Sequence, residues 1–386
     1  MNNNQDPRRQ QMGYDPIDGP QIKRTYTPEE AGHDKHRKPV SRLSYNRRRR
    51  QRPKINAAAV IVTLIFLLIA GLCIFLIASG LNKPPEGGKK DPSSLVGGDT
   101  TDDVTTEDPL PYFEMTLEKE QMHQGTLILV NSMHEYLFPE EMESDIVSIT
   151  EYKNEYYGMS SYSTSVKAGK ICLDAFNRLT EDCYNETGFS YLQINSSYRS
   201  KEDQESLYAQ YVKDYGEDYA AKYVASPGES EHHTGLGIDL NVNRNGKITY
   251  VESDSECEWF RDKCQEYGFI LRYPKDKVHL TGISFESWHY RYVGAPHAQI
   301  MEDMNFCLEE YIDYLKSYTY DGICLGYTDT TGVYDMKAEE FYEAESGVMI
   351  YYVEALEDAT EVLIPKDCVY TVSGNNVDGF IITCTK

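Results

Sequence analysis

Two short segments of this 386-residue chain combine histidine with carboxylate side chains in the manner of a metal site. The first runs Pro227-Gly-Glu-Ser-Glu-His-His-Thr-Gly-Leu-Gly-Ile-Asp239, and the second runs Glu286-Ser-Trp-His289. A hydrolytic zinc site takes three protein ligands from His, Asp or Glu and keeps a fourth position for water. His232, Asp239 and His289 can supply this set, because the glycine-rich turn after His232 can enter a strand that directs Asp239 back toward it.

Two further residues extend this pattern toward catalysis. Zinc lowers the pKa of its bound water toward ~7, and a base must then lie within reach of that water. Glu286 stands three residues before His289 and is well placed for this role. The segment Ser196-Ser-Tyr-Arg-Ser200 follows directly after a predicted strand, and the planar guanidinium of Arg199 matches a carboxylate bidentately. The pattern therefore predicts hydrolysis of a substrate that ends in a free carboxylate.

Taken singly, each of these residues has a structural interpretation, since lone histidines are usually structural. His233 is interpreted as a flanking residue, because neighbours on an extended chain point in opposite directions. His279 is interpreted as a core or surface histidine, and His297 as a helix-start residue. Trp288 is expected to pack around the site. Arg199 by itself is also compatible with a surface charge, since arginines that flank helices are common, so its functional interpretation depends on the rest of the pattern.

The elements that must position these residues alternate between strands and helices. Apolar runs predict strands at 125–131, 191–195, 237–242 and 269–273, and helical spacing predicts helices at 168–184, 201–224, 254–267 and 296–318. These segments are short and irregular, so an α+β fold is favoured over a doubly wound sheet. We expect a compact peptidase domain at 112–318, with a small antiparallel sheet flanked by helices. Short apolar runs between turn signals predict a small β-rich domain at 320–386.

The distribution of charge along the chain predicts membrane topology. Residues 1–54 hold 14 Lys and Arg against 6 Asp and Glu, a net +8, which leaves −32 for the rest of a chain whose total is −24. The next segment, Ala57–Ala78, has 22 residues without a charge. As a helix it reaches about 33 Å, enough to cross a hydrocarbon core of about 30 Å. We therefore predict a transmembrane helix at 57–79, too long and too far along the chain for a signal peptide.

The basic run Arg47–Lys54 precedes this apolar segment. The positive-inside rule accordingly places the N-terminus in the cytoplasm and residues 80–386 outside the membrane. Residues 1–54 are polar and without apolar periodicity, which predicts disorder, and residues 80–111 are typical of a flexible tether. The acidic remainder argues against a nucleic-acid partner. Eight cysteines follow the span, and an even number in an exported domain permits disulfides. None of them forms a CxxC pair, so a structural zinc–thiolate site is not favoured.

The chain resembles the VanY-type D-alanyl-D-alanine carboxypeptidases, a zinc family that also includes D,D-dipeptidases and related wall endopeptidases. The family pattern Ser-x-His-x-x-Gly-x-x-x-Asp falls on Ser230, His232, Gly235 and Asp239, and the pattern Glu-x-Trp-His falls on residues 286–289. The likeness covers about residues 120–316. It implies one zinc ion held by His232, Asp239 and His289, with Glu286 as the catalytic base.

The same resemblance implies substrate contacts for Arg199 and Ser230. Gln204 is a further candidate for substrate binding, although a solvated helix position is as compatible with its place in the sequence. Two departures from the family are visible: Gly237 stands where Ala is usual, and Ser287 where Pro is usual. Neither changes the spacing of the candidate ligands.

The function expected from the resemblance is hydrolysis of the terminal D-Ala-D-Ala bond of peptidoglycan stem peptides by a single-pass protein of the bacterial cell membrane. Related chemistry on another bond remains open: a D,D-dipeptidase, an L,D-carboxypeptidase or a wall endopeptidase. A non-catalytic wall-binding protein is the alternative from another class, and the intact Glu286 speaks against it.

Overall fold

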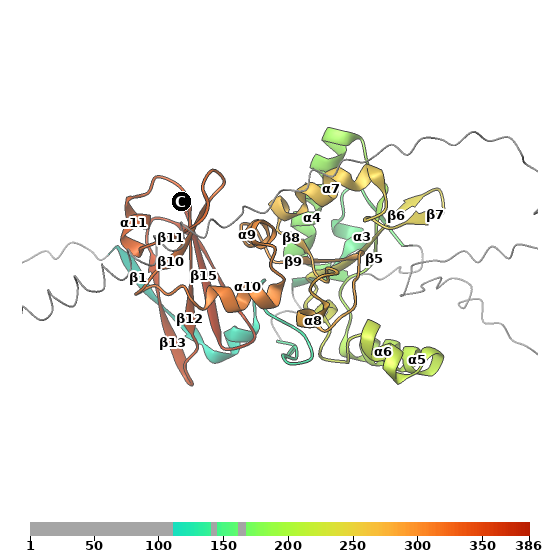
Figure 1. The fold of residues 1–386 in the computed structure, drawn as a ribbon, viewed down its shortest axis with the longest axis horizontal. Coiled ribbons are helices and arrows are strands. Elements are labelled where there is room, and N and C mark those ends of the chain that lie inside the picture. Colours follow the sequence, from blue (N-terminus) through green and yellow to red (C-terminus); the bar gives the residue numbers. More distant parts are fainter. Residues whose placement is uncertain (1–110, 140–144, 161–166) are drawn as a thin grey trace, which may run out of the picture. The chain divides into compact units, whose positions relative to one another are not determined.

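The candidate site residues lie on and around a six-stranded sheet (Figure 1). The computed structural model describes residues 111–139, 145–160 and 167–386. The strands are β3 (Gly158–Met159), β5 (Leu192–Ser196), β6 (Gly237–Arg244), β9 (His289–Tyr292) and β8 (Phe269–Leu271), adjacent in that order, with β7 (Lys247–Thr249) paired to β6. The predicted strands at 191–195, 237–242 and 269–273 are thus confirmed. All pairs are antiparallel except β3 with β5, which is parallel.

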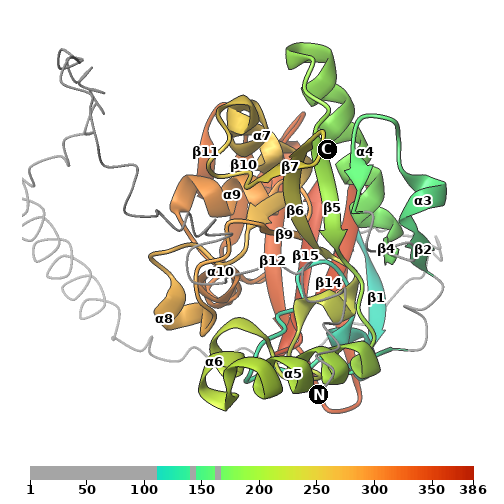
Figure 2. The same cartoon turned by 90° about the vertical axis from the view of Figure 1, so that its right-hand side faces the viewer.

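Helix α4 (Lys170–Thr187) supplies most of the core against this sheet and lies beside β5 and β6 in Figure 2. Its buried residues recur with helical spacing, and Phe176 and Leu179 pack in one cluster with Leu240 of β6. The helix ends at Gly188, whose φ of +73° is the left-handed conformation that glycine adopts at helix C-termini. This agrees with the predicted helix at 168–184.

Apart from α5, the remaining elements around this sheet have seven residues or fewer. Before α4 lie α3 (Ile149–Tyr152) and the small antiparallel pair of β2 (Ile146–Ser148) and β4 (Lys167–Gly169). After β5 come α5 (Lys201–Tyr215), α6 (Glu217–Tyr223) and the 3-10 helix η4 (Glu231–Thr234). After β7 come η5 (Ser255–Cys257), α7 (Glu258–Lys263) and η6 (Cys264–Tyr267), and α8 (Val278–Thr281) precedes β9.

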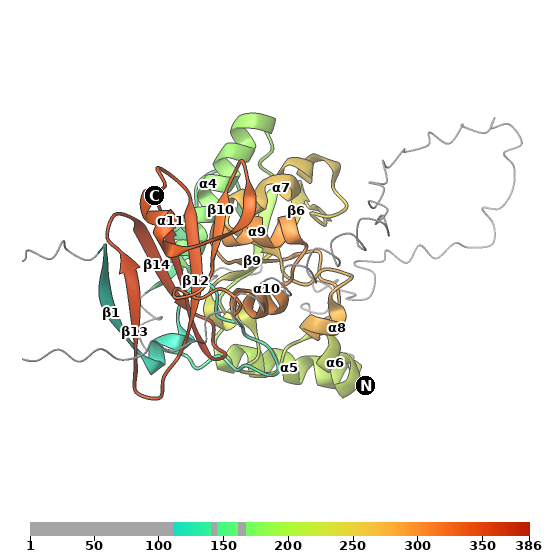
Figure 3. The same ribbon diagram turned by 60° about the vertical axis from the view of Figure 1, so that its left-hand side comes forward.

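The C-terminal residues form a five-stranded antiparallel sheet, coloured orange to red in Figure 3. The order of its strands is β11-β10-β12-β15-β14. Its strands are β10 (Cys324–Thr328), β11 (Gly332–Met336), β12 (Val348–Glu354), β14 (Val369–Gly374) and β15 (Gly379–Thr385), with α11 (Ala338–Glu343) between β11 and β12. A separate pair joins β13 (Ala359–Pro365) to β1 (Tyr112–Glu118), which leads into η3 (Lys119–His123). The first described strand of the chain therefore pairs with its C-terminal part.

Helices α9 (His297–Met304) and α10 (Leu308–Leu315) lie between the two sheets (Figures 1 and 3). One buried cluster joins Ile300 of α9 and Ile312 of α10 to Ile350 and Ile381 of the five-stranded sheet. His297 is also buried, and its ring bonds both Tyr311 and Thr383. The packing of α9 and α10 thus reaches β15, the strand at the C-terminal end of the chain.

The predicted strand at 125–131 is wrong, although its apolar residues are buried. Among the described residues no strand pairs with this segment, and other groups bond its backbone instead. Arg291 donates to the carbonyls of Thr126 and Ile128, and Asn376 donates to that of Leu129. An apolar run indicates burial, and burial without a neighbouring strand edge requires such side-chain donors.

The other three predicted helices are each interrupted. Gly216, with φ +92°, separates α5 from α6, and Asn305, in the left-handed region with φ 54°, ends α9 before α10. The segment predicted at 254–267 consists of the three short helices η5, α7 and η6. Among the described residues no helix is long and apolar enough to cross a membrane. The predicted span at 57–79, the segment 1–54 and the tether up to residue 110 lie outside the described residues.

Candidate metal centre

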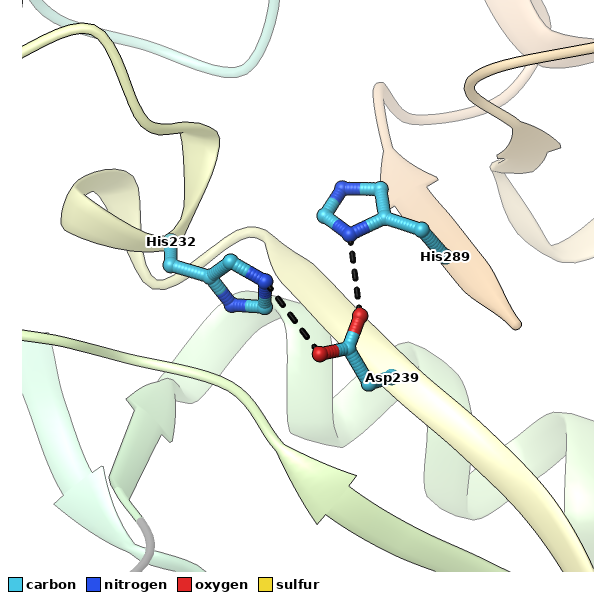
Figure 4. Close-up of side chains that lie close together, drawn as sticks. All are labelled: His232, Asp239 and His289. Carbon is cyan, nitrogen blue, oxygen red and sulfur yellow. Dashed lines mark hydrogen bonds and ion pairs between the residues drawn. The ribbon is translucent and has the colours of Figure 1, made fainter. Parts of the chain in front are cut away.

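His232, Asp239 and His289 converge on one point, and their ligand atoms lie within 4.8 Å of one another (Figure 4). His232 belongs to η4, and Gly235 (φ +69°) turns the chain so that β6 begins at Gly237. Asp239 is the third residue of β6 and lies directly opposite His289 in the register of β6 and β9. The predicted turn from His232 into a strand is thus confirmed, and the pairing of β6 with β9 brings His289 to the other two side chains.

The hydrogen bonds of the two rings leave one nitrogen of each facing Asp239. The carbonyl of Ser197 accepts from Nδ1 of His232 at 2.7 Å, which leaves Nε2 3.4 Å from Oδ2 of Asp239. His289 has the opposite arrangement: Nε2 faces Glu231 at 3.4 Å, and Nδ1 lies 3.0 Å from Oδ1 of Asp239. A partner on the second nitrogen is what fixes the tautomer of a metal-binding histidine.

This donor set fits a single divalent ion of the zinc type. Two nitrogens and one carboxylate are a usual hydrolytic ligand set, and ligand atoms about 2.1 Å from a tetrahedral ion lie about 3.4 Å apart. Nε2 of His232 lies 3.4 Å from Oδ2 of Asp239, and Nδ1 of His289 lies 3.0 Å from Oδ1. One ligand atom from each of the three residues lies within 4.8 Å of the others, so the three side chains can be ligands of one metal ion.

The electrostatics of the cluster follow from its burial. Burial alone would raise the pKa of Asp239, but His232 and then His289 hold that pKa well below its usual range. Burial lowers the pKa of His232. For His289 burial acts in the same direction, but hydrogen bonds to Asp239 and Glu231 outweigh it and raise the pKa to about 9. The cluster thus carries a carboxylate at neutral pH.

Glu286 is buried and interacts electrostatically with both Asp239 and His289. Its backbone is held at both ends, since its N–H donates to the carbonyl of Tyr273 and its own carbonyl accepts from the N–H of His289. Burial raises the pKa of Glu286 to about 8. A carboxyl group with a pKa near neutrality can both accept and return a proton, as a general base requires.

Arg199 is half-buried and held at the end of β5 rather than free on the surface. It donates to Oε1 of Gln204 at 2.6 Å and to Oγ of Ser196 at 3.0 Å. Gln204 is fully buried and in turn donates to the carbonyl of Ala225 at 2.6 Å. Arg199 also interacts electrostatically with Asp239 and Glu286, so its charge belongs to the site. The solvated position considered for Gln204 is therefore wrong.

Ser230 is buried and caps η4, its hydroxyl accepting from the N–H of His232. Substrate contact by Ser230 stays a prediction. His233 flanks the site as expected, but the reason differs, since it belongs to a 3-10 helix rather than an extended segment. One of its ring nitrogens accepts from the N–H of Gly228 and the other bonds the carbonyl of Arg199. Trp288 is half-buried against Tyr250.

Glu231 is the site residue that the motifs did not identify. Its side chain is fully buried and pairs with Arg272 and Arg291, which are also fully buried. A signal was present in the sequence, because both arginines interrupt short runs of apolar and aromatic residues, Phe269–Tyr273 and Tyr290–Val293. Charged residues are almost never fully buried unless paired, so two arginines in buried segments require an acidic partner.

Comparisons with known proteins agree with this geometry. The VanY family model, described as D-alanyl-D-alanine carboxypeptidase, matches residues 166–295. A D-alanyl-D-alanine carboxypeptidase of Enterococcus faecium is 35% identical over 70% of this chain and 78% of its own length. A bifunctional D-Ala-D-Ala dipeptidase and carboxypeptidase of Enterococcus gallinarum is 41% identical over 32% of this chain and 67% of its own.

A solved structure of a vancomycin-resistance D,D-dipeptidase in complex with a D-Ala-D-Ala phosphinate analogue is also similar. It is 33% identical, covers 71% of this chain and 99% of its own, and superposes with a TM-score of 0.59. The mixed α+β peptidase fold is therefore shared. The residues that the family model matches, 166–295, include every candidate ligand position. The chain belongs to the VanY-type family of D-alanyl-D-alanine carboxypeptidases.

Proposed function

We propose that this protein is a D,D-carboxypeptidase that uses one zinc ion to remove the terminal D-Ala from peptidoglycan stem peptides ending in D-Ala-D-Ala. The observation that carries the proposal is the convergence of His232, Asp239 and His289 beside Glu286 and Arg199. The guanidinium of Arg199 beside a metal-binding cluster suits a substrate whose scissile bond lies one residue from a free carboxylate.

Each residue has a distinct part in this reaction. When bound, zinc supplies an activated water and polarises the scissile carbonyl. Arg199 binds the terminal carboxylate of the substrate, with Gln204 and Ser196 holding the guanidinium in place. Glu286 takes a proton from the attacking water and returns it to the leaving amine.

The test is incubation of the protein with a pentapeptide ending in D-Ala-D-Ala and detection of free D-Ala by mass spectrometry. Glu286→Gln should retain the metal and lose roughly 10²–10⁴-fold in kcat. Release of D-Ala at an undiminished rate by this variant would contradict the role of Glu286. No release by the metal-loaded parent protein would contradict the substrate.

A D,D-dipeptidase activity is the second candidate, because one relative is bifunctional and a structural neighbour is named a D,D-dipeptidase. The free dipeptide D-Ala-D-Ala, offered in the same assay, separates the two activities. A strict carboxypeptidase cleaves the pentapeptide and leaves the dipeptide intact. Pentapeptides ending in L-Ala-D-Ala and cross-linked dimers distinguish L,D-carboxypeptidase and endopeptidase activity, and wall binding without turnover would support a non-catalytic role.

We further propose that the enzyme is anchored in the bacterial cell membrane by residues 57–79, with its catalytic part outside. The support is the uncharged run Ala57–Ala78 and the basic residues Arg47–Lys54 before it. Protease treatment of intact protoplasts should degrade an epitope fused after Lys386 and spare one fused before Met1. The reverse pattern would contradict this orientation.

A further inference from the structure

A buried network of four charged residues lies directly behind His289. Oε1 of Glu231 accepts from Nε of Arg272 and from a terminal nitrogen of Arg291, each at 2.7 Å. The side chains of these three residues are fully buried. Glu309 of α10 completes the network, accepting two hydrogen bonds from Arg272 at 2.7 and 2.8 Å. Two cations are thus paired with two anions, as burial of charge requires.

The network ties together segments that are distant in the sequence. Glu231 belongs to η4, Arg291 to β9, and Arg272 directly follows β8. The second terminal nitrogen of Arg291 donates to two carbonyls in the segment 126–128, each at 3.0 Å. Glu231 is therefore held from several directions and has little freedom to change its position.

This restraint matters because of where the second oxygen of Glu231 lies. Both arginines occupy Oε1, whereas Oε2 lies 3.4 Å from Nε2 of His289. A proton on Nε2, facing this carboxylate, leaves Nδ1 with its lone pair toward Asp239, 3.0 Å away. The contact with Glu231 therefore determines which ring nitrogen of His289 can bind a metal ion.

We propose that Glu231 is a positioning residue for His289, which orients its ring and selects the tautomer that presents Nδ1 to the metal. This inference rests on the proposed function, in which His289 is a ligand. Arg272 and Arg291 act through Glu231 by holding its carboxylate. Glu309 braces Arg272 from α10 without contact with His289 in the described structure.

The test compares three variants of the full chain by zinc affinity, measured in competition with a chromophoric chelator. Glu231→Asp keeps a charge for the arginines but shortens the side chain by one methylene, and Glu231→Gln keeps the length but loses the charge. Each should weaken zinc binding roughly 10–100-fold, the usual effect of removing such a partner. Glu309→Gln is the matched control, since it disturbs the same network at its far end and should leave zinc affinity within about threefold.

A second readout reports the tautomer itself. In ¹⁵N-histidine NMR of the zinc-loaded protein, the parent should show His289 protonated at Nε2 and bound to zinc through Nδ1, with its signals assigned as those absent from His289→Ala. Glu231→Asp should lower the population of this form, a change that lost stability alone does not produce. Parent-like zinc affinity and an unchanged tautomer in both Glu231 variants would overturn the inference.

The two proposals fail differently. If zinc binds the parent and the His289→Ala variant equally well, the metal site assigned under the proposed function is wrong, and the role of Glu231 falls with it. If His289→Ala abolishes zinc binding while both Glu231 variants bind normally, only the positioning role is wrong. A Glu309→Gln variant as weak in zinc binding as Glu231→Asp would also overturn it, because a general loss of packing would then explain both.

Discussion

Asp239 and His289 lie directly opposite each other on strands β6 and β9, with Oδ1 of the carboxylate 3.0 Å from Nδ1 of the ring. Side chains opposite each other on antiparallel strands lie on the same face of the sheet and within contact distance. The register of β6 with β9 thus brings together two candidate ligands that are 50 residues apart in the chain. His232 reaches the same carboxylate from the turn that precedes β6.

Removal of this carboxylate should abolish metal binding. Asp239→Asn keeps the shape of the side chain but replaces an anionic ligand with a neutral amide, so zinc content measured by atomic emission should fall from about one ion per chain to near zero. Asn243→Ala changes the same face of β6 further along the strand, where the side chain bonds Gln193 and the N–H of Gly246. This control should keep its zinc. Full zinc occupancy in Asp239→Asn would exclude Asp239 as a required ligand.

Substitution of Arg199 by lysine should impair recognition of the terminal carboxylate. A lysine keeps the charge but cannot form the planar two-point contact, so kcat/KM for the pentapeptide should fall about 10–100-fold, the loss of one charge-assisted hydrogen bond. The parent should also reject a pentapeptide with an amidated C-terminus, and Arg199→Lys should reject it less strongly. Equal discrimination by both proteins would show that another group binds the carboxylate.

The turn between His232 and Asp239 should tolerate no side chain at Gly235. A Cβ there would lie 2.5 Å from Cδ1 of Ile146 and 2.8 Å from the backbone nitrogen of Gly169, in addition to the strain of φ +69°. Gly235→Ala should therefore lose more than about 2 kcal/mol in the free energy of unfolding, measured with urea. Gly246→Ala is the control, because its φ is +88° but nothing lies within 4 Å. It should lose only about 1 kcal/mol, and equal losses would contradict the steric argument.

Stability should fall as the pH falls through the range in which unfolded histidine becomes protonated. Burial lowers the pKa of His297 from 6.5 to about 4, so between these values the unfolded state binds more protons and folding weakens as the pH falls. From pH 7 to 4.5 this histidine should cost about 2 kcal/mol. His297→Gln should remove that part of the slope in urea unfolding with chelator present. His279→Gln is an exposed control and should keep the parent slope.

Among the eight described cysteines, Cys368 should react first with an alkylating reagent. All eight are free thiols, and Cys368 is the one that is not fully buried. Burial nevertheless raises the pKa of its thiol, so labelling should be slow at pH 7 and faster near pH 9. Peptide mass spectrometry after brief labelling of the reduced native protein locates the modified residue. Labelling of Cys172 or Cys324 at a similar rate would contradict the burial seen here.

The sequence by itself determined which residues form the candidate metal cluster. His232, Asp239 and His289 belong to motifs whose spacing reflects local geometry: a turn, a glycine and the start of a strand. The helix near 168–184 and the strands at 191–195 and 237–242 were predictable for a similar reason, since their apolar periodicity matches the surface that they bury.

Only the tertiary structure decided how distant groups meet. The register of β6 with β9, the burial of Gln204 and the pairing of Glu231 with two arginines all depend on contacts across tens of residues. The apolar run at 125–131 shows the same limit, because hydrophobicity determines that a segment is buried but not whether a strand edge is available to it. Local periodicity is encoded along the chain, whereas hydrogen-bond and charge partners are set by the packing of all elements together.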